Sequence, residues 1–229
     1  MDDKYFISGE YGNPSVFNNP EDSDIILICG TKRFYAHRAI LRLWSPFFAR
    51  SLNSQFPVAK SAIFKIDEDE HAKHEPFCAV LKHIYGMPFA DHPENQNDKY
   101  EKCHTSLEYS IRVYMAADKY DVPSARLAAV TSVGDYLPVG QPDCSHVPEW
   151  VANICGPEAP RLADGALRNA LFKFVIDSWD LIIEDLDFAG KIEDGSLFDA
   201  ELNVKLLFEL GKKIKRLNAK SQTTFGGRR

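Results

Sequence analysis

The sequence predicts an α/β (α+β) fold in which a small three-stranded sheet is flanked by helices and followed by a helical C-terminal extension. Three observations support this fold class. A continuous apolar run at residues 25–29 is followed by Gly30 and a second extended run at residues 32–36, which is the pattern of a hairpin. A third segment, residues 63–66, has the alternation of a strand. Beyond residue 165, apolar residues recur every three or four positions, as on one face of a helix.

The segment from residue 23 to residue 52 has the most specific local signals. Its five apolar residues at positions 25–29 predict a strand that is buried on both faces of a sheet. Ser45 and Pro46 predict the start of a helix, because serine caps free amides and proline suits the first helical position. We expect one core to contain the following residues of this segment and of a later helix: Ile26, Ile28, Phe34, Leu41, Phe48, Leu81 and Ile84.

The pattern becomes mainly helical after the third strand. One predicted helix ends at Gly86, which stands where a helix C-cap belongs. Residues 91–104 are polar and lack periodic apolar residues, so they predict an inserted surface loop. The next helix is expected to begin at Thr105, where Thr-Ser-Leu-Glu has the spacing of a capping box. Pro123 then begins a further helix that runs to Leu137.

These residues resemble the pattern of a BTB/POZ domain. The family has an Asp before an apolar strand, a Gly, then Phe-x-Ala-His-Arg/Lys, a Leu and Ser-x-x-Phe. The chain matches that pattern at Asp24, Gly30, Phe34, Ala36, His37, Arg38, Leu41, Ser45 and Phe48. Two later segments also resemble the family, His-Ile-Tyr-Gly at 83–86 and Ala-Asp-Lys-Tyr at 117–120. The resemblance covers residues 21–137 and is to the short stand-alone members that are abundant in fungi.

Outside this region the chain is expected to contain simpler parts. The predicted organisation is a flexible N-terminal arm (1–20), the BTB/POZ domain (21–137) with its inserted loop (91–104), a linker (138–165), a helical C-terminal extension (166–220) and a disordered tail (221–229). The linker is expected to hold one short helical piece around residues 150–154.

The C-terminal extension is expected to contain one long helix, from Leu167 to Leu186, and a final helix that carries Leu202 to Leu217. Two helices alone make a thin core, so we expect them to pack on the BTB/POZ part. The residues expected to be buried within the same chain are Leu171, Phe174, Leu206 and Leu210.

Composition limits the classes of partner and of cellular compartment. The net charge of −6 argues against a general nucleic-acid binder, which needs a surplus of Lys and Arg. No apolar run approaches the roughly 20 residues that span a bilayer, and no secretory signal is visible. The five cysteines are scattered without a CxxC pair, so a disulfide framework or zinc ribbon is not predicted. A reducing compartment, cytoplasm or nucleus, follows. The basic cluster at 212–216 is either a nuclear localisation patch or the polar face of the last helix.

The resemblance implies a charged interaction site at Asp24 and Arg38. In BTB dimers of the transcription-factor type, residues at these motif positions line a charged pocket near the dimer interface. Buried, paired charges favour register and choice of partner more than stability. The alternative is that Asp24 caps local backbone and Arg38 is partly exposed. A homo-oligomer is the partner that the first interpretation implies.

The triplet Phe56-Pro57-Val58 follows the predicted helix that carries Phe47 and Phe48. Adaptors of cullin ubiquitin ligases carry an apolar-x-Glu triplet at this position. Phe56 supplies the apolar residue, but Val58 replaces the acid. A missing interfacial carboxylate leaves its partner unpaired, which costs about 1–3 kcal/mol or more. The resemblance therefore implies a possible cullin partner and, through Val58, weak binding.

Histidines suggest two further hypotheses, a zinc site and a catalytic base, and each has a structural alternative. His71 and His74, with Cys78 four residues on, have a spacing that suits zinc, but Pro76 interrupts the helix and a solvated polar loop is favoured. His37 is interpreted as a packed histidine whose ring bonds backbone rather than as a catalytic base. No catalytic residue, metal ligand or cofactor is therefore predicted.

The sequence as a whole predicts a non-catalytic protein–protein interaction module that self-associates or serves as a scaffold. The alternative is a substrate adaptor for a cullin-type ubiquitin ligase. A third hypothesis, from a different class, is a metal-dependent enzyme that uses the His-rich region. The partners expected are proteins, with neither nucleic acid nor membrane among them.

Overall fold

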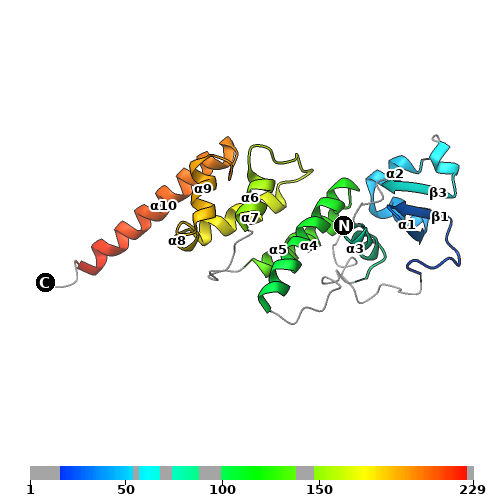
Figure 1. Ribbon diagram of the computed structural model, residues 1–229, viewed down its shortest axis with the longest axis horizontal. Helices are drawn as coiled ribbons and strands as arrows, with labels where there is room; N and C mark the ends of the chain where they lie inside the picture. Colours follow the sequence, from blue (N-terminus) through cyan, green and yellow to red (C-terminus); the bar gives the residue numbers. More distant parts are fainter. Residues whose placement is uncertain (1–15, 54–56, 68–73, 88–98, 138–146, 226–229) are drawn as a thin grey trace. The chain divides into compact units, whose positions relative to one another are not determined.

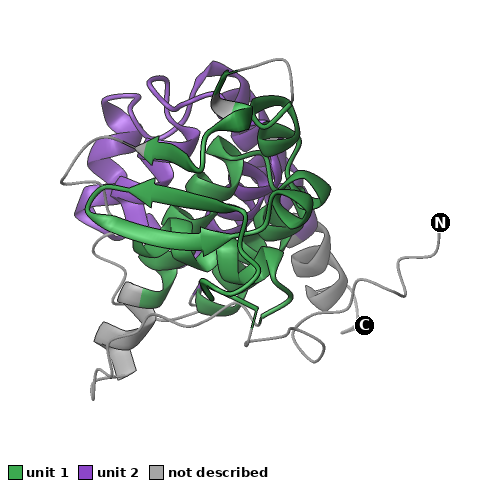
Figure 2. Ribbon diagram, turned by 90° about the vertical axis from the view of Figure 1, so that its right-hand side faces the viewer, with its two compact units in different colours: residues 1–136 green, residues 137–229 purple. Residues whose placement is uncertain are grey.

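The computed structural model describes residues 16–53, 57–67, 74–87, 99–137 and 147–225 (Figure 1). The chain divides into two units, residues 1–136 and residues 137–229, which Figure 2 colours green and purple. The division falls next to Leu137, the last residue of the expected first domain. Each unit has buried apolar residues of its own.

Unit 1 contains the three predicted strands in one sheet. They are β1 (Ile25–Cys29), β2 (Lys32–Ala36) and β3 (Ile63–Asp67), in the order β2-β1-β3. β1 and β2 form an antiparallel hairpin, and Gly30 in its turn has a φ of 56°, a left-handed conformation that glycine adopts without steric cost. β3 pairs with β1 in parallel. The predicted three-stranded sheet is confirmed.

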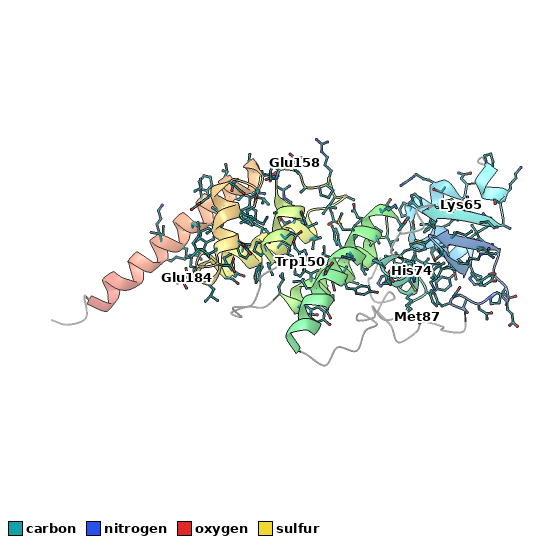
Figure 3. All side chains as sticks on the ribbon, in the orientation of Figure 1. Lys65, His74, Met87, Trp150, Glu158 and Glu184 are labelled. Atoms are coloured by element: carbon teal, nitrogen blue, oxygen red, sulfur yellow. The ribbon has the colours of Figure 1, made fainter. Side chains whose placement is uncertain are left out.

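β1 is buried on one face and half-buried on the other, so the prediction of two buried faces is wrong. The side chains on the buried face are those of Ile25, Leu27 and Cys29. Ile26 and Ile28, which were expected in the core, lie on the other face and are half-buried. The register places Ile26 opposite Ile63, and Ile28 opposite Lys65, which is exposed (Figure 3). A run of apolar residues does not show which face of a strand the helices will cover.

Unit 1 also contains most of the predicted helices. They are α1 (Arg38–Trp44), α2 (Pro46–Ser51), the 3-10 helix η2 (Pro57–Lys60), α3 (Glu75–Ile84), α4 (Lys99–Lys119) and α5 (Pro123–Tyr136). α4 begins at Lys99, so residues 99–104 are helical and the predicted loop and helix start at Thr105 are wrong there. Lys and Glu favour helix without an apolar face, which is why periodicity missed this turn. The rest of the predicted loop lies outside the described residues.

The core of unit 1 lies between one face of the sheet and its helices. Five of the residues expected there are buried: Phe34, Leu41, Phe48, Leu81 and Ile84. Aromatic rings join the elements, with Phe77 of α3 and Tyr120 at the end of α4 at 4.9 Å between ring centroids. Such edge-to-face pairs stabilise a core beyond the area that they bury.

Ser45 connects three helices from a fully buried position. Its Oγ accepts a hydrogen bond from the Phe48 amide at 3.0 Å, so the predicted cap of α2 is confirmed. The same hydroxyl donates to the carbonyl oxygen of Tyr120 at 2.6 Å, at the end of α4. The Ser-x-x-Phe pattern therefore fixes α2 against a helix that lies far away in the sequence.

α4 and α5 are joined by a tight turn at Asp121, whose φ is 49°. The buried Arg126 of α5 places its Nη1 at 3.7 Å from a carboxylate oxygen of Asp118 and at 3.6 Å from one of Asp121. Two carboxylates therefore compensate one buried guanidinium, as buried charges require. This arrangement explains the acidic residues of the Ala-Asp-Lys-Tyr-Asp segment.

Helices are the regular structure of unit 2 in its described part, which contains no strand. Its helices are α6 (Val147–Cys155), α7 (Ala166–Asp177), α8 (Trp179–Ile182), α9 (Leu186–Glu193) and α10 (Ala200–Phe225). The predicted linker therefore contains a nine-residue helix with a buried face, and the predicted single helix up to Leu186 is three helices. α9 starts where Asp185 accepts hydrogen bonds from the amides of Asp187 and Phe188, a helix N-cap that ends any continuous helix.

The helices of unit 2 bury their apolar faces against one another. Leu171, Phe174 and Leu206 are buried as predicted, whereas Leu210 is only half-buried. We expected two helices, too few for a core, but the additional helices α6, α8 and α9 supply the missing surface. Leu210 lies near the middle of α10, whose C-terminal half extends beyond the other helices of this unit in Figure 1, so Leu210 is covered only in part.

Gly156 and Asp199 hold the first and last helices of unit 2 together. A Cβ at Gly156 would meet the carbonyl oxygen of Ala152 and, at 2.6 Å, that of Ser196. Asp199 donates its amide to the carbonyl of Cys155 at 2.8 Å and caps α10 by accepting from the Leu202 amide at 2.9 Å. Its carboxylate also pairs with Arg168 of α7.

Candidate protein-interaction site

Asp24 and Arg38 meet at the corner where β1 begins and α1 begins. Oδ1 of Asp24 accepts a hydrogen bond from the Arg38 amide at 2.8 Å. His37, the N-cap residue of α1, makes no side-chain cap of its own. Asp24 therefore caps α1 from a distant position in the sequence, and its negative charge suits the N-terminal end of a helix.

The Arg38 side chain binds backbone carbonyls rather than the Asp24 carboxylate. Its Nη1 donates to the carbonyl of Ala59 at 2.8 Å, and its Nη2 donates to the carbonyl of Ser61. Its Nε reaches the backbone carbonyl of Asp24 at 3.3 Å. The planar guanidinium thus ties the segment after η2 to the start of α1.

The structure therefore brings the two predicted interface residues together, through backbone contacts. Asp24 is exposed and Arg38 is half-buried. This is the geometry of the alternative interpretation, in which Asp24 caps backbone. It leaves the Asp24 carboxylate at the surface, beside the outward face of α1.

The outward face of α1 carries an apolar residue that the sequence analysis did not identify as a site. Leu43 is 77% exposed, and Ala39, one turn earlier on the same face, is also exposed. Leu41, in contrast, is fully buried. The helical period contains the signal, because Leu43 lies one turn from Ala39 and on the side opposite to Leu41.

The predicted cullin triplet is described only in part. Phe56 lies outside the described residues, and Pro57 is exposed at the start of η2. Val58 belongs to η2, but its side chain lies outside the described part. This 3-10 helix lies between α2 and β3, and Arg38 binds its end through the carbonyl of Ala59.

His37 is bonded to a distant tyrosine, so the prediction that its ring bonds backbone is wrong. The Tyr85 hydroxyl lies 2.9 Å from the His37 amide nitrogen and 2.9 Å from its Nδ1. The hydroxyl accepts from the amide and can share its own proton with Nδ1. Burial raises the pKa of Tyr85 to about 12, although the hydrogen bond from the His37 amide lowers it. These contacts are those of a packed histidine.

The His-rich region is described only in part. His71 and His92 lie outside the described residues, as do the side chains of Cys103 and His104. His74 stands before α3, where Figure 3 labels it. Burial raises the pKa of the Cys78 thiol, which keeps it protonated. In the described part of the chain, no group of three His, Cys, Asp or Glu residues is arranged to hold a metal ion.

The described helices include none that is long and apolar enough to cross a membrane. Comparison with protein-family models gives a match to the BTB/POZ domain over residues 15–130. The match spans 116 of the 229 residues, slightly more than half. It contains the corner at Asp24 and Arg38, all of α1 and the triplet at 56–58.

Proposed function

Because the chain belongs to the BTB/POZ domain family, it carries a protein–protein interaction module, and we propose that this module self-associates through the outward face of α1. The family consists of interaction modules rather than enzymes. The partner in this proposal is a second copy of the chain, and the contact is isologous, so the same patch of each copy faces the other.

The single observation that carries the proposal is the exposure of Leu43. A leucine that is 77% exposed leaves apolar area in water, and it lies one turn from exposed Ala39 on the helix that begins at the Asp24–Arg38 corner. An isologous contact would bury both apolar side chains of each copy at the centre. It would also place Asp24 and Arg38 of each copy at the rim, where charges set the register and the association rate.

The test compares Leu43→Ser with a matched control, Leu127→Ser. Leu127 of α5 is 67% exposed and lies on another helix of the same unit. We expect Leu43→Ser to raise the dissociation constant at least about tenfold, the effect of losing a buried leucine at a contact centre, while Leu127→Ser changes it little. Sedimentation velocity over a concentration series measures both. Equal behaviour of the two variants would contradict the proposal.

A second candidate function, the cullin adaptor, is supported by the position of η2. This helix follows α2, starts with an exposed proline and is held in place by Arg38. Because Val58 stands where adaptors place Glu, we expect the wild-type chain to bind a cullin N-terminal domain weakly and Val58→Glu to bind it at least about tenfold more tightly. Titration calorimetry distinguishes the candidates, and an absence of binding in both proteins would remove this one.

A further inference from the structure

One surface of unit 2 is acidic and partly apolar. We call it the acidic surface and define it as residues 177–187, which cover the end of α7, all of α8 and the start of α9. These residues include five acids and no Lys or Arg, a formal charge of −5. The exposed apolar residues among the carboxylates are Leu181, Ile183 and Leu186, and Leu186 is 87% exposed. Glu184 extends from the turn that follows α8 (Figure 3).

A second surface of unit 2 is basic and partly apolar. We call it the basic surface and define it as residues 205–216 of α10. This stretch has five basic residues and one acid, a formal charge of +4. Phe208, which is 68% exposed, lies one turn from Lys205 and from Lys212 on the same face of α10, whereas exposed Leu207 and Ile214 lie on another face. Leu206, the residue before Leu207, is buried and faces the core of the unit.

The two surfaces adjoin each other in one chain. Nζ of Lys213 lies 2.6 Å from a carboxylate oxygen of Asp180, which joins the basic surface to the acidic surface at their border. Figure 1 shows α8 beside α10 at this point. Phe208 of the basic surface and the exposed apolar residues of the acidic surface therefore lie in two adjoining regions of opposite charge.

We propose that unit 2 carries a second interface with another copy of this chain, in which the basic surface of each copy packs on the acidic surface of the other. A two-fold axis along the border would place both surfaces of one copy against their opposites at the same time. The contact would bury Phe208 of the basic surface and the exposed apolar residues of the acidic surface while pairing their charges. This interface is independent of the one proposed at α1, which lies in unit 1.

The distribution of charge favours a second copy of the chain over a nucleic acid or an anionic membrane. A nucleic acid would meet the acidic surface beside the basic one, and its phosphates would be repelled there. An anionic membrane would meet the same repulsion. A second copy is the partner whose charges match both surfaces without any further assumption.

Charge reversal in the full chain tests the proposal. The acidic-side variant is Glu184→Lys with Asp187→Lys, and the basic-side variant is Lys215→Glu with Arg216→Glu; all four residues are exposed. Asp185 is left unchanged because it caps α9. The control variant, Glu158→Lys with Arg161→Glu, reverses two exposed charges in the segment after α6. Every chain also carries Leu43→Ser, so that the α1 interface does not contribute.

We expect each reversed variant alone to associate at least about tenfold more weakly than the Leu43→Ser chain and the control, because like charges then face each other. An equimolar mixture of the two reversed variants should associate again as heterodimers, since opposite charges are restored at both contacts. Sedimentation velocity at low salt measures the masses, and native mass spectrometry of chains with different tags identifies the heterodimers. Raised salt should weaken every complex.

Three results would overturn the proposal. The first is association of both reversed variants as tight as that of the control. The second is a mixture no tighter than either variant alone. The third is a Leu43→Ser chain that stays monomeric at all concentrations, which would mean that unit 1 or a different protein covers these surfaces. Failure of the α1 proposal has a different signature, because Leu43→Ser then has no effect while the charge reversals retain theirs.

Discussion

At the scale of single residues, the Tyr85 hydroxyl makes the contact with the clearest consequence. It bonds both the amide and the ring of His37, and the tyrosine is almost completely buried. Tyr85→Phe leaves these groups without their partner, and we expect a loss of about 1–3 kcal/mol in the free energy of unfolding. Tyr35→Phe is the control, because Tyr35 is half-buried and its amide donates to Asn18, while its hydroxyl has no hydrogen bond to any described residue. Urea denaturation at neutral pH measures both, and an equal loss in the two variants would contradict the role given to the hydroxyl.

The raised pKa of Tyr85 predicts that the free energy of unfolding depends on pH in the alkaline range. Burial is the largest cause that raises the pKa of Tyr85 to about 12, with a further rise from the Asp24 carboxylate. The unfolded tyrosine ionises near pH 10, so between about pH 10 and pH 12 the folded chain holds a proton that the unfolded chain has lost. The stability of the wild-type chain therefore falls as the pH rises through this window. We expect the stability gap between wild type and Tyr85→Phe to narrow from pH 8 to pH 10.5, and a constant gap would refute this.

Individual contacts of this kind were beyond the reach of the sequence. A packed histidine at position 37 was predicted, but its partner lies 48 residues away and no local pattern indicates it. The prediction for Asp24 and Arg38 was limited in the same way, because it did not include their individual contacts. Asp24 and Arg38 were expected, by resemblance, to line a charged pocket, yet only the structure shows that one caps α1 and the other binds the carbonyls of residues 59 and 61.

At the scale of elements, α1 depends on a cap that is supplied from outside the helix. Asp24→Ala removes the acceptor for the Arg38 amide, and we expect a loss of about 0.5–2 kcal/mol in the free energy of unfolding. Asp24→Asn retains an oxygen at the same place and should lose clearly less. Thermal and urea denaturation compare the two variants. Equal losses would mean that the charge of Asp24, rather than the cap, stabilises this corner.

Two adjacent leucines of α10 give a direct measurement of which face of the helix is in the core. Leu206 is 6% exposed and Leu207 is 71% exposed. We expect Leu206→Ala to cost about 2–5 kcal/mol, as for other buried leucines, and Leu207→Ala to change stability by about 0.5 kcal/mol or less. Urea denaturation of each variant at low protein concentration tests this, since dilution keeps any association through Leu207 out of the measurement. Similar costs at the two positions would show that α10 is oriented differently.

Elements with strong local signals were predicted well, and those without them were not. Ser45 and Pro46 fixed the start of α2, where the cap is observed. The first turn of α4 was missed because its residues are polar, so periodicity contains no information about it. The break between α8 and α9 had a local signal, an Asp at position 185 that caps the next helix, but the apolar spacing that continues through it concealed the boundary.

At the scale of the whole molecule, sequence resemblance was informative for one unit only. The family pattern lies entirely in unit 1, where the three-stranded sheet and five of the seven expected core residues were predicted. Unit 2 had only periodicity to guide prediction, and periodicity does not show how many helices share a core. The count of two helices was wrong, because five helices pack together in the described part of unit 2.

Because each unit has buried apolar residues of its own, we expect a destabilising substitution to accelerate amide exchange only in the unit that contains it. Gly156→Ala forces a Cβ against the backbone carbonyls of Ala152 and Ser196 in unit 2, and backbone cannot move aside as a flexible side chain can. Overpacking of this kind costs about 1–3 kcal/mol. Leu81→Ala empties a buried site in unit 1 and costs about 2–5 kcal/mol. In hydrogen exchange measured by mass spectrometry, we expect Gly156→Ala to accelerate the amides of α6, α7 and α10 and to leave those of β1 and α3 unchanged, with the reverse pattern for Leu81→Ala. If either substitution accelerated exchange equally in both units, the chain would unfold as one cooperative body.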